Sequence, residues 1–196
     1  MLGSHRRRVA LGIIALGLTA TSIVLSSTAL LRAGVPAVSA PSSAGAVWTE
    51  EPWPFAIDQW GTGQAFRCIS WVCGADLHLY LRAKIGFCRC ATGVSEDDEI
   101  DRVGDTELLG PNYKPVSAGQ ALIAGILRGR ARLFRIDRAF RSSILALTVA
   151  LANKCDAVVA IVTSADDISS TQEAIALDFL RSETVQRWAK MNTGLE

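Results

Sequence analysis

Five cysteines are the residues of this sequence with the widest choice of chemistry, as disulfides, nucleophiles or metal ligands: Cys68, Cys73, Cys88, Cys90 and Cys155. Cys88 and Cys90 cannot form a relaxed disulfide with each other, because a single residue separates them. Each is therefore expected to pair with one of the other three cysteines, and the sequence leaves the connectivity open. Because five is an odd number, one thiol stays free or joins a second copy of the chain in a homodimer.

A metal site is the alternative for the same residues. Cys68-x4-Cys73 and Cys88-x-Cys90 place four thiols within 23 residues, close enough in sequence to surround a zinc ion. These spacings differ from the paired CxxC of common zinc sites, so disulfides are the favoured interpretation. The rival interpretation is a thiol- or metal-dependent enzyme or carrier that uses these four cysteines.

Three arginines at alternate positions form a second candidate site. Arg128, Arg130 and Arg132 would share one face of a strand, where three guanidinium groups could clamp a phosphate or a carboxylate. The favoured expectation is a solvated face on which these arginines pair with the acidic run at residues 96–101.

His78 is the one histidine beyond the N-terminal segment, and Asp76 would point the same way on its strand. A histidine, an acid and a cysteine thiol could form a hydrolase site, but a lone strand histidine is more often a surface residue. The sequence contains no GxSxG, HExxH, phosphate-binding loop or dinucleotide fingerprint. No catalytic residue and no cofactor are assigned, zinc being the alternative.

The N-terminal segment predicts export. Residues 9–31 form an uncharged run of 23 residues, enough for a helix of roughly 35 Å that crosses a membrane. Arg6, Arg7 and Arg8 precede this run, and only Arg32 follows closely, so the positive-inside rule places residues 1–8 in the cytoplasm. We predict a transmembrane signal anchor, with a cleaved signal peptide as the alternative. The expected location is the cell inner membrane with the C-terminal domain in the periplasm, or the periplasm itself after cleavage.

The remainder of the chain is predicted to be a linker, residues 32–47, followed by one exported domain, residues 48–196. Ala, Gly, Ser and Pro dominate the linker, which therefore has too few large apolar residues to fold. Residues 51–196 carry 16 basic and 18 acidic groups, so the net charge of this part of the chain is about −2. That balance argues against nucleic acid as a partner. Four aromatic residues at the start of the domain are expected to pack into its core: Trp48, Trp53, Phe55 and Trp60.

Alternating apolar residues predict strands over residues 64–71 and 77–87, the second with one face on the core and one face toward water. A capping box of Ser95 and Asp98 predicts a helix that ends near Leu109. Residues 120–137 are predicted as a strand pair or one long bent strand. Residues 144–152 and 157–163 are predicted as a buried hairpin, although the first could instead be a helix.

Two C-terminal helices complete the expected domain. Ser170 and Glu173 form a capping box for the first helix, and Ser182 caps the second, which carries Val185 and Trp188. Strands outnumber helices and follow one another without regular helical crossovers. The predicted fold is α+β, an antiparallel sheet with helices on one face, preceded by one N-terminal transmembrane helix.

Several short stretches resemble a group of uncharacterised exported bacterial proteins: Phe66-Arg67-Cys68, Cys73-Gly74, Tyr80-Leu-Arg-Ala-Lys-Ile-Gly-Phe-Cys88-Arg-Cys90, Gly93-Val94, Asp101-Arg102-Val103 and Cys155-Asp156. The resemblance covers most of residues 52–165 and implies export and these cysteine positions, but no reaction. The sequence therefore favours a membrane-anchored periplasmic protein that acts as a non-catalytic binding or assembly module of the cell envelope, with an envelope protein as its partner.

Overall fold

The computed structural model describes residues 47–87, 89–138 and 142–193. The predicted cytoplasmic segment, the predicted span at residues 9–31, nearly all of the linker and Cys88 lie outside these ranges. Within them, no helix is long and apolar enough to cross a membrane.

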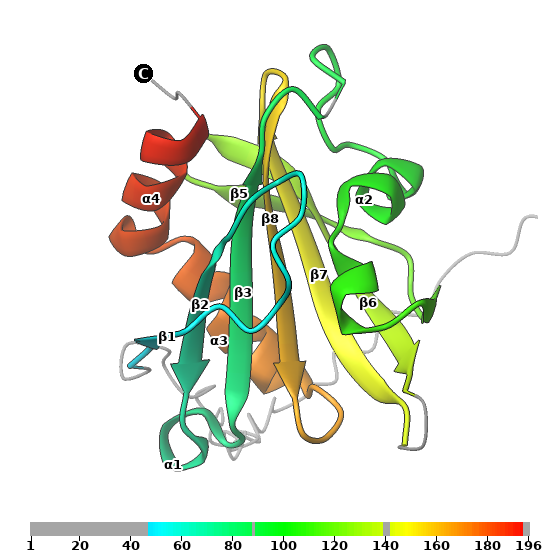
Figure 1. The fold of residues 1–196 in the computed structure, drawn as a ribbon, viewed down its shortest axis with the longest axis vertical. Coiled ribbons are helices and arrows are strands. Elements are labelled where there is room, and N and C mark those ends of the chain that lie inside the picture. Colours follow the sequence, from blue (N-terminus) through cyan, green and yellow to red (C-terminus); the bar gives the residue numbers. More distant parts are fainter. Residues whose placement is uncertain (1–46, 88, 139–141, 194–196) are drawn as a thin grey trace, which may run out of the picture. The chain divides into compact units, whose positions relative to one another are not determined.

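In the described part of the chain, an eight-stranded antiparallel sheet forms the centre of the domain, with the strand order β1-β2-β3-β8-β7-β6-β4 (Figure 1). β5 also pairs with β6, so β4 and β5 occupy different halves of the same side of this long strand. The strands are β1 (Thr49–Glu51), β2 (Gln64–Cys68), β3 (Leu77–Lys84), β4 (Asn112–Pro115), β5 (Gln120–Ala124), β6 (Leu127–Asp137), β7 (Ile144–Asn153) and β8 (Asp156–Ser164). The predicted α+β architecture with an antiparallel sheet is confirmed.

β7 and β8 form the predicted hairpin at the centre of the sheet. Both strands are apolar along almost their whole length, and almost every side chain on either face is buried. The helical alternative for residues 144–152 is therefore wrong. The turn holds only Lys154 and Cys155, and Lys154 adopts a positive φ of 56° there.

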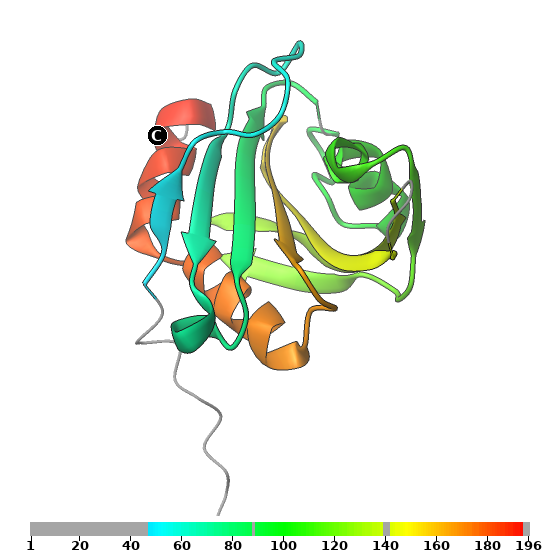
Figure 2. The same cartoon turned by 60° about the horizontal axis from the view of Figure 1, so that its bottom comes forward.

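Two C-terminal helices, α3 (Ser170–Leu180) and α4 (Glu183–Thr193), cover one face of the sheet, which we call the α3 face (Figure 2). Their apolar residues join the largest core cluster, for example Leu180 and Val185 against Leu79 and Leu147. The capping box of α3 consists of Ser169 and Gln172, one residue earlier than predicted. The Ser182 hydroxyl accepts from the Val185 N–H at the start of α4, which confirms the predicted cap.

A second layer covers the opposite face, which we call the α2 face. It consists of α2 (Asp97–Val103) and the 3-10 helix η2 (Thr106–Leu109). The sequence predicted helices on one face only, but β7 and β8 are apolar on both sides, so both faces need a cover. The predicted Ser95–Asp98 capping box is wrong: Glu96 is the N-cap of α2 and its side chain makes no capping bond.

The connection between β1 and β2, residues 52–63, crosses the α2 face in front of β3 (Figure 1). Trp53 and Phe55 pack edge-on against each other and against Tyr80 of β3. Trp48, by contrast, stacks on Phe179 of α3. The N-terminal aromatic residues do pack against the domain, but on opposite faces of its sheet.

Candidate functional site

Four of the five cysteines form two disulfides, Cys68–Cys73 and Cys90–Cys155. The first closes the short helix α1 (Ser70–Cys73) onto the end of β2, and the second ties the turn around residues 89–93 to the β7–β8 turn. Disulfides are confirmed as a class, the expected pairing of Cys90 with one of the other cysteines is confirmed, and the structure gives the connectivity that the sequence left open. The expectation that Cys88 pairs with Cys68, Cys73 or Cys155 is wrong, because each of these three is joined to another cysteine.

The disulfides also bear on the alternative zinc site at Cys68, Cys73, Cys88 and Cys90. Three of these four sulfur atoms are oxidised, and a disulfide sulfur is not the thiolate that zinc requires. Cys88 lies outside the described residues. Across the described ranges, no three His, Cys, Asp or Glu side chains lie together in a way that could hold a metal ion.

The three arginines of β6 divide between two surroundings. Arg132 donates from Nη1 to both oxygens of Asp101 at 2.7 Å, and Arg130 pairs with Asp97 at 2.6 Å. The Gly119 N–H lowers the pKa of Asp97; burial opposes this, and Arg130 and Arg132 reinforce it. The sequence favoured a pairing of these arginines with the acidic run at residues 96–101, and the two ion pairs are such a pairing.

Arg128 lies apart from that pairing. Its side chain lines a shallow hollow beside the Cys90–Cys155 disulfide, together with Thr92 and Asn153. The structure therefore does not bring the three guanidinium groups together around one anion.

His78 has an acidic partner that the sequence did not indicate. Its Nδ1 lies 2.7 Å from the Glu51 carboxylate of β1. Asp76 instead binds the Arg67 guanidinium and the Ser70 N–H, and these two contacts lower its pKa. The two residues considered for a hydrolase site are thus engaged with different neighbours.

A buried cluster of charges lies on the α2 face, where the sequence predicted that β3 would meet water. Arg82 is 2% exposed and donates to both oxygens of Asp105, from Nε at 2.8 Å and from Nη2 at 2.7 Å. Lys84, also 2% exposed, lies 2.6 Å from Asp105 and donates to the Val103 carbonyl at 2.9 Å. Asp105 follows α2, so this cluster joins the helical layer to the sheet.

Asp58 completes the cluster from the β1–β2 connection. Arg82 Nη1 donates to both Asp58 oxygens at 2.8 Å, and the Asp58 side chain is 40% exposed. Burial raises the pKa of Asp58, but hydrogen bonds from Arg82 and the Trp60 N–H, with the nearby positive charges, lower it overall. Two cations thus face two carboxylates, and we call these four residues the charge cluster.

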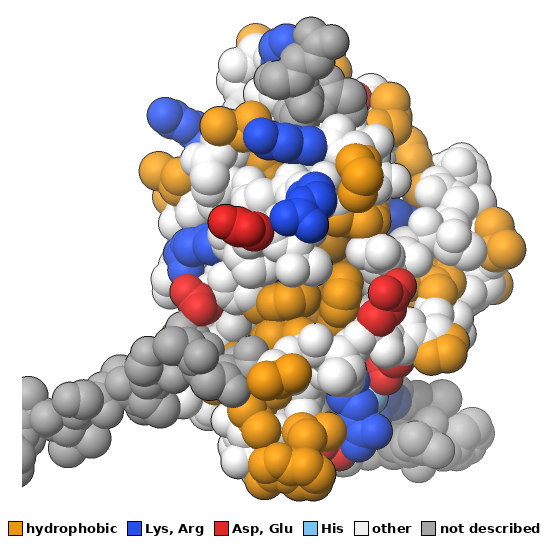
Figure 3. Space-filling model, turned by 90° about the vertical axis from the view of Figure 1, so that its left-hand side faces the viewer, with side chains coloured by type: hydrophobic (Ala, Val, Ile, Leu, Met, Phe, Trp, Pro, Cys, Tyr) orange, Lys and Arg blue, Asp and Glu red, His pale blue; other side chains and the backbone are white. Residues whose placement is uncertain are grey.

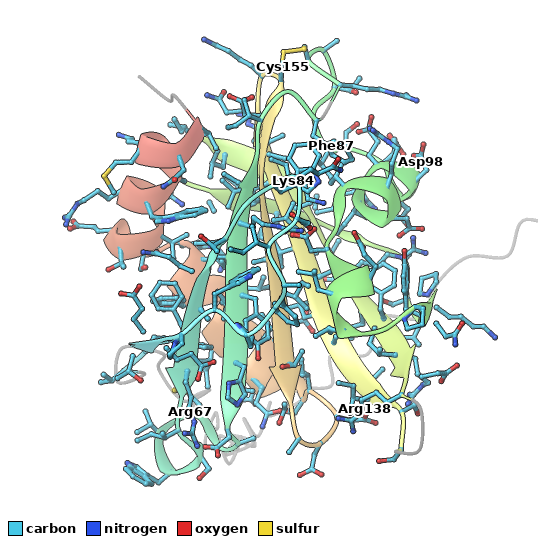
Figure 4. All side chains as sticks on the ribbon, viewed as in Figure 1. Arg67, Lys84, Phe87, Asp98, Arg138 and Cys155 are labelled. Atoms are coloured by element: carbon cyan, nitrogen blue, oxygen red, sulfur yellow. A yellow bond between two sulfur atoms is a disulfide. The ribbon has the colours of Figure 1, made fainter. Side chains whose placement is uncertain are left out.

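Aromatic rings enclose the charge cluster. The Arg82 guanidinium lies 5.9 Å from the Trp53 ring, and Lys84 Nζ lies 5.5 Å from Trp60 and 5.0 Å from Phe87. Figure 4 shows Lys84 and Phe87 close together beside α2. Since each charged group faces an opposite charge, the arrangement is suited to fastening the two layers together rather than to activating a substrate.

Trp71 is the most exposed large hydrophobic residue among those described, with 84% of its surface accessible. It lies in α1, between the two cysteines of the first disulfide. Figure 3 shows hydrophobic side chains gathered at the lower tip of the domain, the end at which Figure 1 places α1. The sequence predicts Trp71 as the last residue of a strand, and the structure places it in α1 instead. A tryptophan between two cysteines five positions apart was the signal that could have identified it.

No protein-family model matches this chain, and no curated protein matches it in sequence.

Proposed function

We propose that this protein is an exported binding or assembly module of the cell envelope, anchored in the inner membrane by residues 9–31 and without a catalytic role. The observation that carries the proposal is the pair of disulfides in the domain that follows this apolar run. Disulfides form and persist in oxidising compartments such as the periplasm and are rare in the cytosol.

The partners of the cysteines, of His78 and of the charged residues on β3 support a binding role. Four thiols are consumed in disulfides, His78 pairs with Glu51, and the β3 cations pair with carboxylates. Trp71, in contrast, is exposed on the short helix α1, whose last residue, Cys73, is joined covalently to Cys68 at the end of β2. Rigid exposed tryptophans are favoured anchors in binding surfaces, because they bury a large area and lose little conformational entropy.

The rival function, a thiol- or metal-dependent enzyme or carrier, would need the cysteines around Cys68 and Cys90 as free thiols. No contact in the described ranges favours it. A homodimer joined through Cys88 and an envelope protein as partner remain predictions.

The proposal is tested by fusing alkaline phosphatase, and separately green fluorescent protein, to the C-terminus of the full chain in a Gram-negative host. We expect active phosphatase and a dark fluorescent protein, because the former needs an oxidising compartment and the latter fluoresces in the cytosol. A fusion directly after Arg8, on the cytoplasmic side of the span, is the matched control and should give the opposite result. A fluorescent C-terminal fusion with inactive phosphatase would overturn the proposal. The mass of the purified chain distinguishes an uncleaved anchor from a cleaved signal.

A further inference from the structure

The described chain begins at the same end of the domain as Trp71. In the β1–β2 pairing Thr49 is opposite Arg67, so the start of β1 lies beside the end of β2 that leads into α1. Trp48 packs against the cluster that contains both Cys68 and Cys73. We call this the α1 end. Figure 4 shows Arg67 and Arg138 near this end and Cys155 near the opposite one.

The chain that precedes β1 therefore joins the domain at the α1 end. The predicted linker from the span comprises 16 residues, 32–47. A flexible chain of that length has an end-to-end distance of about 20–24 Å, and its fully extended length is at most about 55 Å. If residues 9–31 cross the membrane, the α1 end stays close to the lipid surface, where even a weak contact is favoured by the tether.

Trp71 has the chemistry that such a surface binds. Its ring combines an apolar body with one N–H donor, which is why tryptophan is enriched at membrane–water interfaces. The Cys68–Cys73 disulfide closes α1, and Asp76 accepts from the Ser70 N–H at the first residue of this helix, so the presentation of Trp71 is fixed before contact.

We propose that the α1 end rests on the outer surface of the membrane that anchors the chain, with the Trp71 indole in the lipid headgroup layer. This inference rests on the proposed anchoring by residues 9–31. Arg67 at this end is paired with Asp76, so indole burial rather than attraction to anionic lipid is the expected source of binding.

The test uses the full-length chain in vesicles of phosphatidylcholine, with and without a headgroup nitroxide that quenches tryptophan fluorescence. The chain has five tryptophans, and all of them lie outside the predicted span. If the five emit equally, quenching of Trp71 alone removes about a fifth of the emission. Flotation of the vesicles on a density gradient first shows whether the chain is membrane-bound.

Two variants provide the controls. Trp71→Phe removes the indole that reports the proposed contact, at an exposed position where folding does not depend on the side chain. Trp71→Phe combined with Ile126→Trp keeps five tryptophans and moves the exposed one to the opposite end, since Ile126 is 56% exposed and lines the hollow beside Cys90. We expect the nitroxide to quench the wild-type chain by about a fifth more than either variant.

The outcomes separate this inference from the proposed anchoring. A chain that floats with the vesicles, but is quenched to the same extent as Trp71→Phe, overturns the membrane contact and leaves the anchoring intact. A chain that does not float overturns both. Protection of Trp71 from aqueous acrylamide in native envelope membranes, but not in lipid vesicles, would assign this surface to a protein partner and also overturn the membrane contact.

Discussion

Replacing Asp105 by asparagine tests whether the charge cluster holds the α2 face of the domain together. Asp105 is 2% exposed and neutralises both Arg82 and Lys84. The substitution keeps the size of the side chain but removes its charge. It leaves two buried cations opposite Asp58 alone, which is 40% exposed and therefore partly hydrated.

The expected loss of stability is large because the remaining cations cannot reach bulk water. Removing one partner of a buried ion pair costs about 3–5 kcal/mol. That is a substantial part of the roughly 5–15 kcal/mol by which a domain is stable. Asp58→Asn removes a carboxylate from the same guanidinium but at the surface, where water screens the charge, so about 1 kcal/mol or less is expected.

Urea unfolding of the oxidised full-length chain in a mild detergent measures both variants. A double variant, Asp105→Asn with Lys84→Met, restores the balance of one cation and one carboxylate around Arg82. We expect it to be more stable than the sum of the single losses predicts, by about 1 kcal/mol or more. Equal effects of Asp105→Asn and Asp58→Asn, or strict additivity in the double variant, would refute the reasoning.

Three further perturbations test the rest of the structure. Cys90→Ser opens a disulfide between cysteines 65 positions apart, and Cys68→Ser opens one between cysteines five positions apart; losses of about 4 and 2 kcal/mol in urea unfolding are expected, and the reverse order would contradict the pairing. Because the pKa of Asp58 is lowered in the folded protein, folding favours its charged form; the stability that it contributes is present above about pH 4 and is lost as the pH falls below that value. In Asp58→Asn, the free energy of unfolding should therefore fall less steeply as the pH drops below about 4 than it does in the wild-type chain. An equally steep fall in both proteins would contradict this. Ser169→Ala removes the side chain that caps α3 and should lower the free energy of unfolding by about 1 kcal/mol. An unchanged free energy of unfolding would mean that Ser169 does not stabilise the start of α3.

Sequence patterns predicted the strands and helices well where an apolar run was long and where the paired residues lie close together in the sequence. The apolar runs of β7 and β8 surround a short polar stretch, and they form the hairpin that the sequence predicted. The predicted cap of α3 differs from the observed one by one residue, because the sequence offers two overlapping capping boxes, Ser169 with Gln172 and Ser170 with Glu173. The packing of the chain that precedes the helix, and not the local sequence, decides which of the two serines becomes the cap.

The charge cluster could not be predicted in the same way. Alternation along β3 showed that Arg82 and Lys84 share a face, but not that another layer would cover that face. The partners that make their burial tolerable, Asp58 and Asp105, lie 24 and 23 positions from Arg82. Nothing in the spacing connects them, because contacts of this range depend on the path of the β1–β2 connection and of α2 across the sheet.

The disulfides were predicted as a class but not as pairs. Cys90 and Cys155 pair although they are 65 positions apart, because two turns meet at one end of the sheet. That meeting follows from the order of the strands rather than from the local sequence. The place of Trp71 was not predicted for a related reason: the strand expected to include it ends at Cys68, and the following residues form α1, whose last residue is joined by a disulfide to Cys68.

The redox state of the cysteines in the cell tests the central claim most directly. Cells are lysed in acid, free thiols are alkylated, and the peptides of the full-length chain are mapped by mass spectrometry without reduction. An exported disulfide-bonded domain predicts peptides linked through Cys68–Cys73 and Cys90–Cys155, with no alkylation at these four positions. Alkylation of all five cysteines would contradict the account, because it would place the domain in a reducing compartment.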